Sequence, residues 1–280
     1  MRKKAIAVMV NGLPGNMATK VAEHIISAEK DKYPFWLCNN SLTGPEVEQK
    51  EVNVKYIIIN LFRPDERKDL EGFIKKWQAR GDFIAVDFSH PSAVNDNAKF
   101  YCSHEIPFVM GTTGGDPTKL AEMVSQSKNY AVIAPNMAKQ IVAFQSMVEY
   151  AAHNFSNAFE GYTLEIIESH QQGKADTSGT AKAMVSCFNS LGIPFSKDQI
   201  VMIRDPEKQR AMGIPEDALG GHGWHSYTLR SPDGSIFFQF THNVNGRDIY
   251  ALGTLDAINF LAKNYQTGKV YSMKDVLKGS

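Results

Sequence analysis

The chain has 280 residues, of which 43% are hydrophobic, which suffices for one large domain or two modest ones. Lys plus Arg and Asp plus Glu each number 30, so the formal net charge is zero. This balance argues against a general electrostatic partner such as DNA or an anionic membrane surface, and we expect neither nucleic acid nor membrane as a partner. No apolar run is long enough to cross a bilayer.

The cysteines and the N-terminus give expectations about the compartment. Cys38, Cys102 and Cys187 are widely spaced and odd in number, which is neither a disulfide framework nor a metal-ligand pattern. Met1-Arg-Lys-Lys leads directly into an expected strand, with no visible signal or transit peptide. We therefore expect a cytoplasmic protein, although a protein of the plastid stroma trimmed to its mature form would read the same.

The first apolar run is followed by glycines. Ala5–Val10 is typical of a buried parallel strand, and Gly12-Leu-Pro-Gly15-Asn-Met17 follows it before a helical pattern through Val21 and Ile25. A strand, a glycine turn and a helix form the context of a dinucleotide-binding loop, in which the pyrophosphate lies on the helix N-terminus. The G-x-x-G spacing is shorter than the full fingerprint, and a plain tight turn is the alternative interpretation.

The alternation of strands and helices continues as far as residue 134. Strands are expected at 35–38, 54–61, 83–88, 107–110 and 130–134, and helices at 64–80, 91–101 and 117–126. This pattern predicts an α/β fold with a parallel, doubly wound sheet, in which ligands bind at the carboxyl ends of the strands. Four loops are expected at that edge: Gly12–Met17, Asn39–Ser41, Gly111–Gly115 and Pro135–Asn136.

The end of the second strand decides the choice of cofactor. A carboxylate there favours NAD and a basic residue favours NADP. Asn39, Asn40 and Ser41 supply neither, so we expect NADPH as the cofactor, with NADH as the alternative.

The second half has a different organisation. A long helix is expected at 137–155, a strand at 162–167, a hairpin of strands at 224–229 and 235–242, and a helix at 249–264. Ser231-Pro-Asp-Gly234 is the turn signal of the hairpin. The charged residues that follow the last helix are expected to end on the surface.

One stretch of the second half carries candidate chemistry. His170 and Lys174 follow an apolar strand, and Ser178-Gly-Thr180 precedes a helical pattern that begins at Ala181. A helix N-terminus has unpaired N–H groups, and His and Lys add donors and titratable acids. We infer a site that binds a small carboxylate-bearing substrate and protonates it, while an ordinary N-cap with a solvated His and Lys is the alternative.

The histidines do not predict a metal site. His222, His225 and His242 could join His170, but none pairs with a Cys or a carboxylate at ligand spacing. We therefore expect no metal ion.

Taken together, these residues resemble a known family. Glu168-Ser-His-Gln-x-x-Lys-x-Asp-x-Ser-Gly-Thr-Ala181 resembles the substrate-binding signature of the 4-hydroxy-tetrahydrodipicolinate reductases, which act in the diaminopimelate route to lysine. Phe108–Gly115, Ala134–Met137, Asp87-Phe88 and His242–Arg247 resemble further family segments in the right order. Glu-Ser-His-Gln in place of Ala-His-His, and Ser-Gly-Thr without a preceding Pro, resemble the plant-type branch.

The resemblance implies a fold and a reaction. Residues 1–137 with 250–280 would form a Rossmann-type dinucleotide-binding domain, and residues 138–249 a central α+β domain for substrate binding and oligomerisation. The expected reaction is the NAD(P)H-dependent reduction of 4-hydroxy-tetrahydrodipicolinate, a small dicarboxylate, to tetrahydrodipicolinate. A homo-oligomer, dimer or tetramer, is expected.

The resemblance also implies roles for individual residues. His170 and Lys174 match the proton-donating and substrate-orienting positions, and Ser178, Gly179 and Thr180 match the carboxylate cradle, to which we add Gln171. The expected cofactor-binding residues are Gly12, Gly15, Asn16, Met17, Asn39, Gly111, Thr113, Ala134, Pro135 and Asn136. This chain departs from the family at Asn16-Met-Ala18, where a Lys or Arg is usually followed by Met-Gly, and a lost cationic contact to the cofactor phosphates would lower the affinity or weaken the preference for NADP.

Two other functions fit parts of the pattern. One is another reductase on the same plan, such as a homoserine or aspartate-semialdehyde dehydrogenase, although the latter requires a Cys nucleophile that no motif here provides. The other is a catalytically silent NAD(P)-binding sensor, which would bind cofactor without turnover.

Overall fold

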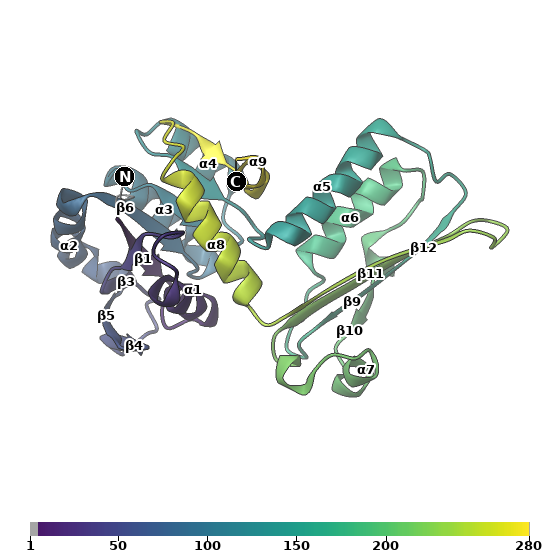
Figure 1. The fold of residues 1–280 in the computed structure, drawn as a ribbon, viewed down its shortest axis with the longest axis horizontal. Coiled ribbons are helices and arrows are strands. Elements are labelled where there is room, and N and C mark those ends of the chain that lie inside the picture. The colour runs from purple at the N-terminus through teal and green to yellow at the C-terminus, as the bar shows by residue number, and fades with distance from the viewer. Residues whose placement is uncertain (1–4, 280) are drawn as a thin grey trace. The chain divides into compact units, whose positions relative to one another are not determined.

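The computed structural model describes residues 5–279, so Met1-Arg-Lys-Lys and residue 280 lie outside the described part. The chain divides into two compact units, Met1–Lys139 with Asp248–Ser280 and Gln140–Arg247. The chain thus returns to the first unit after completing the second, as the yellow C-terminal segment of Figure 1 shows. The first unit ends at Lys139 rather than at residue 137, and resumes at Asp248 rather than at residue 250.

A six-stranded sheet forms the centre of the first unit. Its order is β13-β8-β7-β6-β1-β2, and neighbouring strands pair in parallel. The strands are β1 (Ile6–Asn11), β2 (Phe35–Leu37), β6 (Asp82–Asp87), β7 (Phe108–Met110), β8 (Ala131–Ile133) and β13 (Val270–Tyr271). Because β1 pairs with β2 on one side and β6 on the other, the strand order reverses at β1, and such a switch point is where parallel sheets bind ligands.

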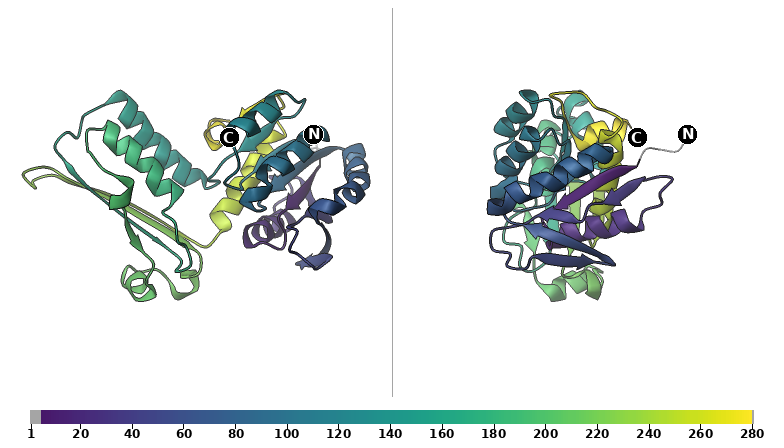
Figure 2. Two further views of the ribbon diagram at one scale, coloured as in Figure 1. Left: turned by 180° about the vertical axis from the view of Figure 1, so that it is seen from behind. Right: turned by 90° about the vertical axis from the view of Figure 1, so that its left-hand side faces the viewer.

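Helices cover this sheet, and all of them except the last were expected from the sequence pattern. They are α1 (Asn16–Ser27), α2 (Arg67–Arg80), α3 (Val94–Ser103), α4 (Pro117–Ser125), α8 (Asp248–Leu261) and α9 (Met273–Lys278), with short 3-10 turns at Pro64–Glu66 and Pro91–Ala93. The helix α8 lies beside α1, although more than two hundred residues separate them in sequence (Figures 1 and 2). At Gly253 of α8 a Cβ atom would lie 1.8 Å from the Met137 carbonyl oxygen, so only glycine permits this close approach.

The expected strand at 54–61 is wrong in its extent and its sheet. The chain there forms a hairpin of β4 (Glu51–Val54) and β5 (Ile57–Phe62), which turns at Lys55 with φ of 53°. A separate sheet of order β3-β5-β4 results, in which β3 (Asn40–Leu42) occupies the loop expected at Asn39–Ser41. The reason is visible in β5, where Ile59 is buried and Ile58 is 54% exposed. Such alternation belongs to a sheet with one open face rather than to a buried parallel strand.

The C-terminal residues also differ from expectation. They do not simply end on the surface, because β13 pairs with β8 and α9 buries Met273 and Val276. The apolar residues that carry this packing are few and widely spaced among charged ones, which concealed them in the sequence.

The second unit is a four-stranded sheet with helices on one face. The sheet has the order β10-β9-β11-β12, and α5 and α6 lie side by side along it (Figures 1 and 2). The elements are α5 (Lys139–Asn154), β9 (Thr163–His170), α6 (Gly179–Ser190), β10 (Val201–Ile203), α7 (Pro206–Ala211), β11 (His222–Arg230) and β12 (Phe237–Asn245), with 3-10 turns at Lys197–Gln199 and Glu216–Ala218. Ile166 and Tyr227 of the sheet pack against Met184 and Phe188 of α6, which forms the core.

Two sequence expectations in this unit have clear outcomes. The hairpin with its turn at Ser231–Gly234 is confirmed, since Gly234 has φ of 74° and its N–H donates to the Ser231 carbonyl at 3.0 Å. The strand before the central stretch is longer than expected and ends at His170, so Glu168, Ser169 and His170 are strand residues rather than loop residues. Within residues 5–279 no helix combines the length and apolar character needed to span a membrane.

Candidate active site

The loop after β1 has the geometry of an anion-binding turn. Gly12 has φ of +98°, and a Cβ atom there would lie 2.2 Å from the Phe88 carbonyl oxygen. Gly15 is the N-cap of α1, which has neither a side-chain cap nor an acidic residue in its first turn. The first N–H groups of α1 are therefore not satisfied by a cap, and together with the helix dipole they favour a phosphate.

A buried polar network joins this loop to the loop after β7. The carboxylate of Asp87, at the end of β6, accepts hydrogen bonds from the Ser89 hydroxyl at 2.7 Å, the Thr112 hydroxyl at 2.8 Å and the Tyr101 hydroxyl at 2.6 Å. The Asp87 carbonyl accepts the Gly111 N–H at 3.0 Å. Asn11 donates to the Tyr101 hydroxyl at 2.9 Å, so the carboxyl ends of β1, β6 and β7 are linked by one network.

The other expected cofactor residues follow neighbouring strands. Asn39 follows β2, and Ala134, Pro135 and Asn136 follow β8. Packing leaves no room for a side chain at Gly111, since a Cβ atom there would lie 2.2 Å from the Phe88 ring. The parallel strands place all these residues at the same edge of the sheet, which is the edge that carries the glycine loop.

The second candidate cluster begins on β9. Ile166, Glu168 and His170 point to one face of the sheet because side chains alternate along a strand. Ile166 belongs to the apolar core, whereas Glu168, with no exposed area, and His170 continue the same face toward the carboxyl end of the strand. On the neighbouring strand His225 is opposite Glu168, and its Nε2 atom lies 3.8 Å from a Glu168 oxygen.

The loop between β9 and α6 is held by hydrogen bonds. The Lys174 N–H donates to the Gln171 carbonyl at 3.0 Å, and the Lys174 Nζ atom lies 2.5 Å from an Asp176 oxygen. The predicted N-cap is confirmed, since the Ser178 Oγ atom accepts the Thr180 N–H at 3.2 Å. This Oγ atom also lies 3.0 Å from the His225 Nε2 atom. The structure thus brings His170, Gln171, Lys174 and the Ser-Gly-Thr motif into one unit.

Burial keeps the imidazoles of this cluster neutral. It lowers the pKa of His170 to about 4, with the nearby Arg204 and Lys174 charges acting in the same direction. Burial also lowers the pKa of His225 well below its usual value and lowers that of His242. Glu168 lies near His170, but its carboxylate is paired with Arg204 and therefore stabilises an imidazolium only weakly.

Glu168, His170 and His225 each offer a metal-ligand atom, and these atoms lie within 4.8 Å of one another. The sequence spacing did not reveal this carboxylate beside the imidazoles. Both Glu168 oxygens already accept hydrogen bonds, one from Arg204 at 2.7 Å and one from the Ser178 N–H at 3.0 Å. The adjacent guanidinium opposes a cation, so these three side chains are poorly suited to bind a metal ion.

Sequence reasoning assigned no role to several residues that shape the cluster. Arg204 contacts Glu168 and also donates to the Lys174 carbonyl at 2.8 Å, and Gln209 donates to the His170 carbonyl at 2.8 Å. Arg204 and Gln209 lie 30 to 39 residues from these partners, in a region for which the hydrophobic pattern predicted no element. The sequence offered one signal here. Asp205-Pro206 predicts a helix N-terminus, which is the start of α7, and Arg204 immediately precedes it.

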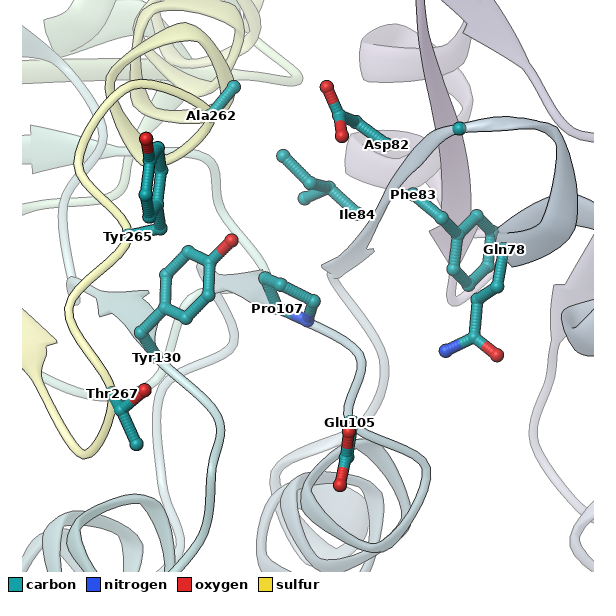
Figure 3. A pocket seen from close by; sticks show the side chains of 11 residues that line it. Gln78, Asp82, Phe83, Ile84, Glu105, Pro107, Tyr130, Ala262, Tyr265 and Thr267 are labelled. Atoms are coloured by element: carbon teal, nitrogen blue, oxygen red, sulfur yellow. The ribbon is translucent and has the colours of Figure 1, made fainter.

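One cavity of the first unit lies away from these residues. It has a volume of about 630 Å³ and is lined by the amino ends of β6, β7 and β8, including Asp82, Pro107 and Tyr130 (Figure 3). The glycine loops are at the carboxyl ends of the same strands. The cavity therefore belongs to the opposite edge of the sheet and contains none of the expected site residues.

The first unit carries a glycine loop at the switch point of a parallel sheet, and the second carries a His, a Lys and a capped helix N-terminus. This combination defines a two-domain reductase of the nucleotide-dependent type. The family model described as dihydrodipicolinate reductase, N-terminus, matches residues 6–137, and the one described as dihydrodipicolinate reductase, C-terminus, matches residues 140–277. The chain belongs to the dihydrodipicolinate reductase family, which is a family of oxidoreductases.

Individual relatives agree with this membership. The chain is 45% identical to 4-hydroxy-tetrahydrodipicolinate reductase 1, chloroplastic, of Arabidopsis thaliana, over 98% of this chain and 78% of that protein. It is 31% identical to 4-hydroxy-tetrahydrodipicolinate reductase of Alkaliphilus metalliredigens, over 96% of this chain and 98% of the other. A dipicolinate-bound dihydrodipicolinate reductase from Paenisporosarcina sp. TG-14 shares the fold, with a TM-score of 0.66, 17% identity and coverage of 96% and 98%.

Proposed function

We propose that this protein reduces 4-hydroxy-tetrahydrodipicolinate to tetrahydrodipicolinate with a nicotinamide nucleotide, in the diaminopimelate route to lysine. The observation that supports this most strongly is the cluster of His170, Lys174 and the Ser178-capped α6, in a chain whose relatives carry that activity in their names. The first unit would be the dinucleotide-binding domain, and the second the substrate-binding and oligomerisation domain.

The residues at the carboxyl edge of the first sheet fit a dinucleotide. Asn16 and Met17 would place backbone N–H groups against the pyrophosphate, since the N-terminus of α1 is uncapped. Gly12 and Gly15 would let the loop approach it closely, while their own N–H groups donate to the carbonyls of Leu42 and Gly12. Gly111, Thr113 and residues 134–136 would contact the nicotinamide half. When bound, the nucleotide supplies a hydride to the substrate.

The second unit would bind the dicarboxylate and protonate it. Glu168 occupies the Ser178 N–H, so we assign the substrate carboxylate to the Gly179 N–H and the Thr180 hydroxyl, with Gln171 as a further donor. Burial lowers the pKa of His170 to about 4, so a protonated imidazole would be scarce at neutral pH. Lys174 is therefore the better proton donor, and neutral His170 would donate a hydrogen bond that orients the substrate.

The preference between NADPH and NADH is a separate proposal. We propose NADPH, with NADH also accepted, because Asn39 and Ser41 place no carboxylate near the ribose 2′ position to repel a phosphate. Asn16 lacks the charge of the Lys or Arg expected there, which would weaken binding of either cofactor.

The sheet of the second unit supports a homo-oligomer. The edge strand β12 exposes apolar side chains over consecutive positions, with Phe237 52%, Phe238 39% and Phe240 40% exposed, and Ile236 beside them is 46% exposed. An apolar edge strand is a template for pairing with another chain, and a second copy would cover it. Whether the assembly is a dimer or a tetramer is decided by its mass in solution.

For the compartment we propose the cytoplasm or, for a plant-type enzyme, the plastid stroma. The three cysteines are free thiols, which suits a reducing environment. The Arabidopsis relatives are named chloroplastic. Tagging the natural precursor with a fluorescent protein would distinguish the two.

A coupled assay tests the proposed reaction. Dihydrodipicolinate synthase generates the substrate in place from pyruvate and aspartate semialdehyde, and oxidation of NADPH and NADH is followed in parallel. We expect rapid oxidation that falls at least a hundredfold in Lys174→Ala and is unchanged in Lys197→Ala, an exposed lysine of the same unit. Wild-type turnover in Lys174→Ala would remove Lys174 as the proton donor. Cofactor binding without oxidation would favour the sensor, and NAD(P)H oxidation with aspartate semialdehyde alone, without the synthase, would favour a homoserine dehydrogenase.

A further inference from the structure

One ion pair, between Glu168 and Arg204, connects the loop of residues 171–178 to the sheet. The proposed reaction assigns no role to this pair. Glu168 has no exposed area. Its Oε1 atom accepts from the Arg204 Nη2 atom at 2.7 Å, and its Oε2 atom accepts the Ser178 N–H at 3.0 Å. The carboxylate therefore fixes the residue that caps α6, ten positions along the chain.

The guanidinium of Arg204 extends this tie to Lys174. Its Nε atom donates to the Lys174 carbonyl at 2.8 Å, and its Nη2 atom to the Asp176 carbonyl at 3.3 Å. A planar guanidinium offers several donors in a rigid array, which a lysine ammonium does not. One side chain thus holds the backbone of Lys174, the backbone of Asp176 and the carboxylate of Glu168 in a single arrangement.

Stability alone is a weak reason for such a pair. Desolvation offsets much of the Coulomb attraction between buried charges, and an apolar pair of similar volume often stabilises a fold as well. The pair is 18% exposed at Arg204 and fully buried at Glu168, so both charges have lost most of their water. What it does supply is a defined geometry for the loop and a balanced charge beside the cap.

The balance of charge is important because the expected ligand is an anion. The Glu168 carboxylate is bonded to the N–H of Ser178, next to Gly179 and Thr180, which we assign to the substrate carboxylate. An unpaired Glu168 carboxylate would repel the substrate carboxylate, because the two charges would be close together in a medium of low dielectric constant. Arg204 neutralises it without using the donors at the N-terminus of α6.

We propose that Glu168 and Arg204 are positioning residues of the reductase: they hold Lys174 and the N-terminus of α6 in the arrangement that receives the substrate carboxylate, and Arg204 cancels the charge that Glu168 would otherwise present to it. This inference rests on the proposed function of the same cluster. Neither residue contacts the substrate. Their loss therefore acts on substrate binding through the loop and leaves the nucleotide site of the other unit unchanged.

Four variants and one control test the proposal in the full-length enzyme. In Arg204→Gln the Glu168 charge is unpaired, and we expect KM for the dicarboxylate to rise at least tenfold, with the Kd for NADPH unchanged. In Glu168→Gln/Arg204→Gln that charge is absent, and we expect KM to recover at least threefold from the Arg204→Gln value. Arg204→Lys restores the charge but not the bonds to two carbonyls, so KM should recover while kcat stays below the wild-type value. Glu168→Gln alone should raise KM less than Arg204→Gln does.

The control is Arg210→Gln, which removes a bidentate Arg–Glu pair of the same unit that is exposed to solvent. We expect wild-type kinetics for it. Equal KM values in the wild type and Arg204→Gln, or a double variant as poor as Arg204→Gln, would overturn the proposal, because KM for the dicarboxylate would then not depend on the unpaired charge of Glu168. If Arg204→Gln does not fold, as judged by circular dichroism and NADPH binding, Arg204→Lys and the double variant are compared with the wild type, and a KM at least tenfold above the wild-type value in both would overturn the proposal. An inactive wild type would refute the proposed function rather than this inference.

Discussion

Replacing Asp87 by Asn should destabilise the first unit and loosen its cofactor edge. The carboxylate has no exposed area and accepts five hydrogen bonds: at Oδ1 from the Ser89 N–H, the Ser89 hydroxyl and the Thr112 hydroxyl, and at Oδ2 from Asn97 at 2.9 Å and Tyr101 at 2.6 Å. An Asn side chain turns one of these oxygens into a donor. In either orientation of the Asn side chain, its NH₂ group then faces an N–H group, of Ser89 or of Asn97, that cannot accept a hydrogen bond.

The magnitude follows from these contacts. One hydrogen bond to a charged group, worth about 1.5–3 kcal/mol, is lost outright, and a buried donor is left unsatisfied at about 1–3 kcal/mol. Rotation of the hydroxyls recovers part of this, so we expect a loss of about 3 kcal/mol in the free energy of unfolding. The carboxylate also bonds Thr112, which adjoins the expected nicotinamide contacts, and we expect weaker NADPH binding as well.

Urea denaturation followed by tryptophan fluorescence measures this loss, because Trp36 and Trp77 report on the first unit. Asp69→Asn, at an exposed position of α2, is the control and should change stability by less than about 0.5 kcal/mol. A loss below about 1 kcal/mol in Asp87→Asn would refute the reasoning, since it would mean that the donors find other partners without cost.

Three further predictions concern the loop, the imidazoles and the edge strand. Gly12→Ala should raise the Kd for NADPH at least tenfold in a calorimetric titration, because its Cβ atom meets the Phe88 carbonyl, whereas Gly72→Ala, on open helix surface, should bind normally and gain about 0.5–1 kcal/mol of stability. Burial holds the pKa of His170 at about 4, below its unfolded value, so the unfolded chain binds more protons than the folded chain between about pH 4 and 6.5. The free energy of unfolding should therefore fall as pH falls through that window, by up to about 1.4 kcal/mol per pH unit for this imidazole. Denaturation curves at pH 7.5 and 5.0 that coincide would contradict this. Phe237→Asp should lower the mass measured by light scattering to that of a smaller species, while Tyr56→Asp, on the β4–β5 hairpin, should not.

Much of the architecture is predictable because it depends on local chemistry. The continuous apolar run Ile6–Val10 predicts a buried strand, and a glycine turn before an amphipathic helix predicts a phosphate-binding loop. The Ser178 cap is equally local, since a hydroxyl that accepts an N–H two residues later needs only its own neighbours. The family signature around His170 and Lys174 added the reaction to this framework.

Other features required the folded chain. The strand expected at 54–61 lies outside the main sheet, because a turn at Lys55 pairs its residues with Glu51–Val54 in a hairpin. The strand β13 joined the main sheet from beyond the last expected helix. Sequence periodicity gives the faces of a strand but not its partner, which depends on register and on what else covers the sheet.

The amino-acid sequence by itself determined the alternating strands and helices, the glycine loop, the capped helix and the membership in a reductase family, because each depends on residues close together in the chain. Only the tertiary structure decided that Glu168 meets Arg204, thirty-six residues away, and that Asp87 accepts hydrogen bonds from Tyr101 and Thr112 while Asn11 donates to the same Tyr101 hydroxyl. Such contacts follow from which strands become neighbours. Their physical importance lies in burial, because a carboxylate that has lost its water must find its donors wherever the fold brings them.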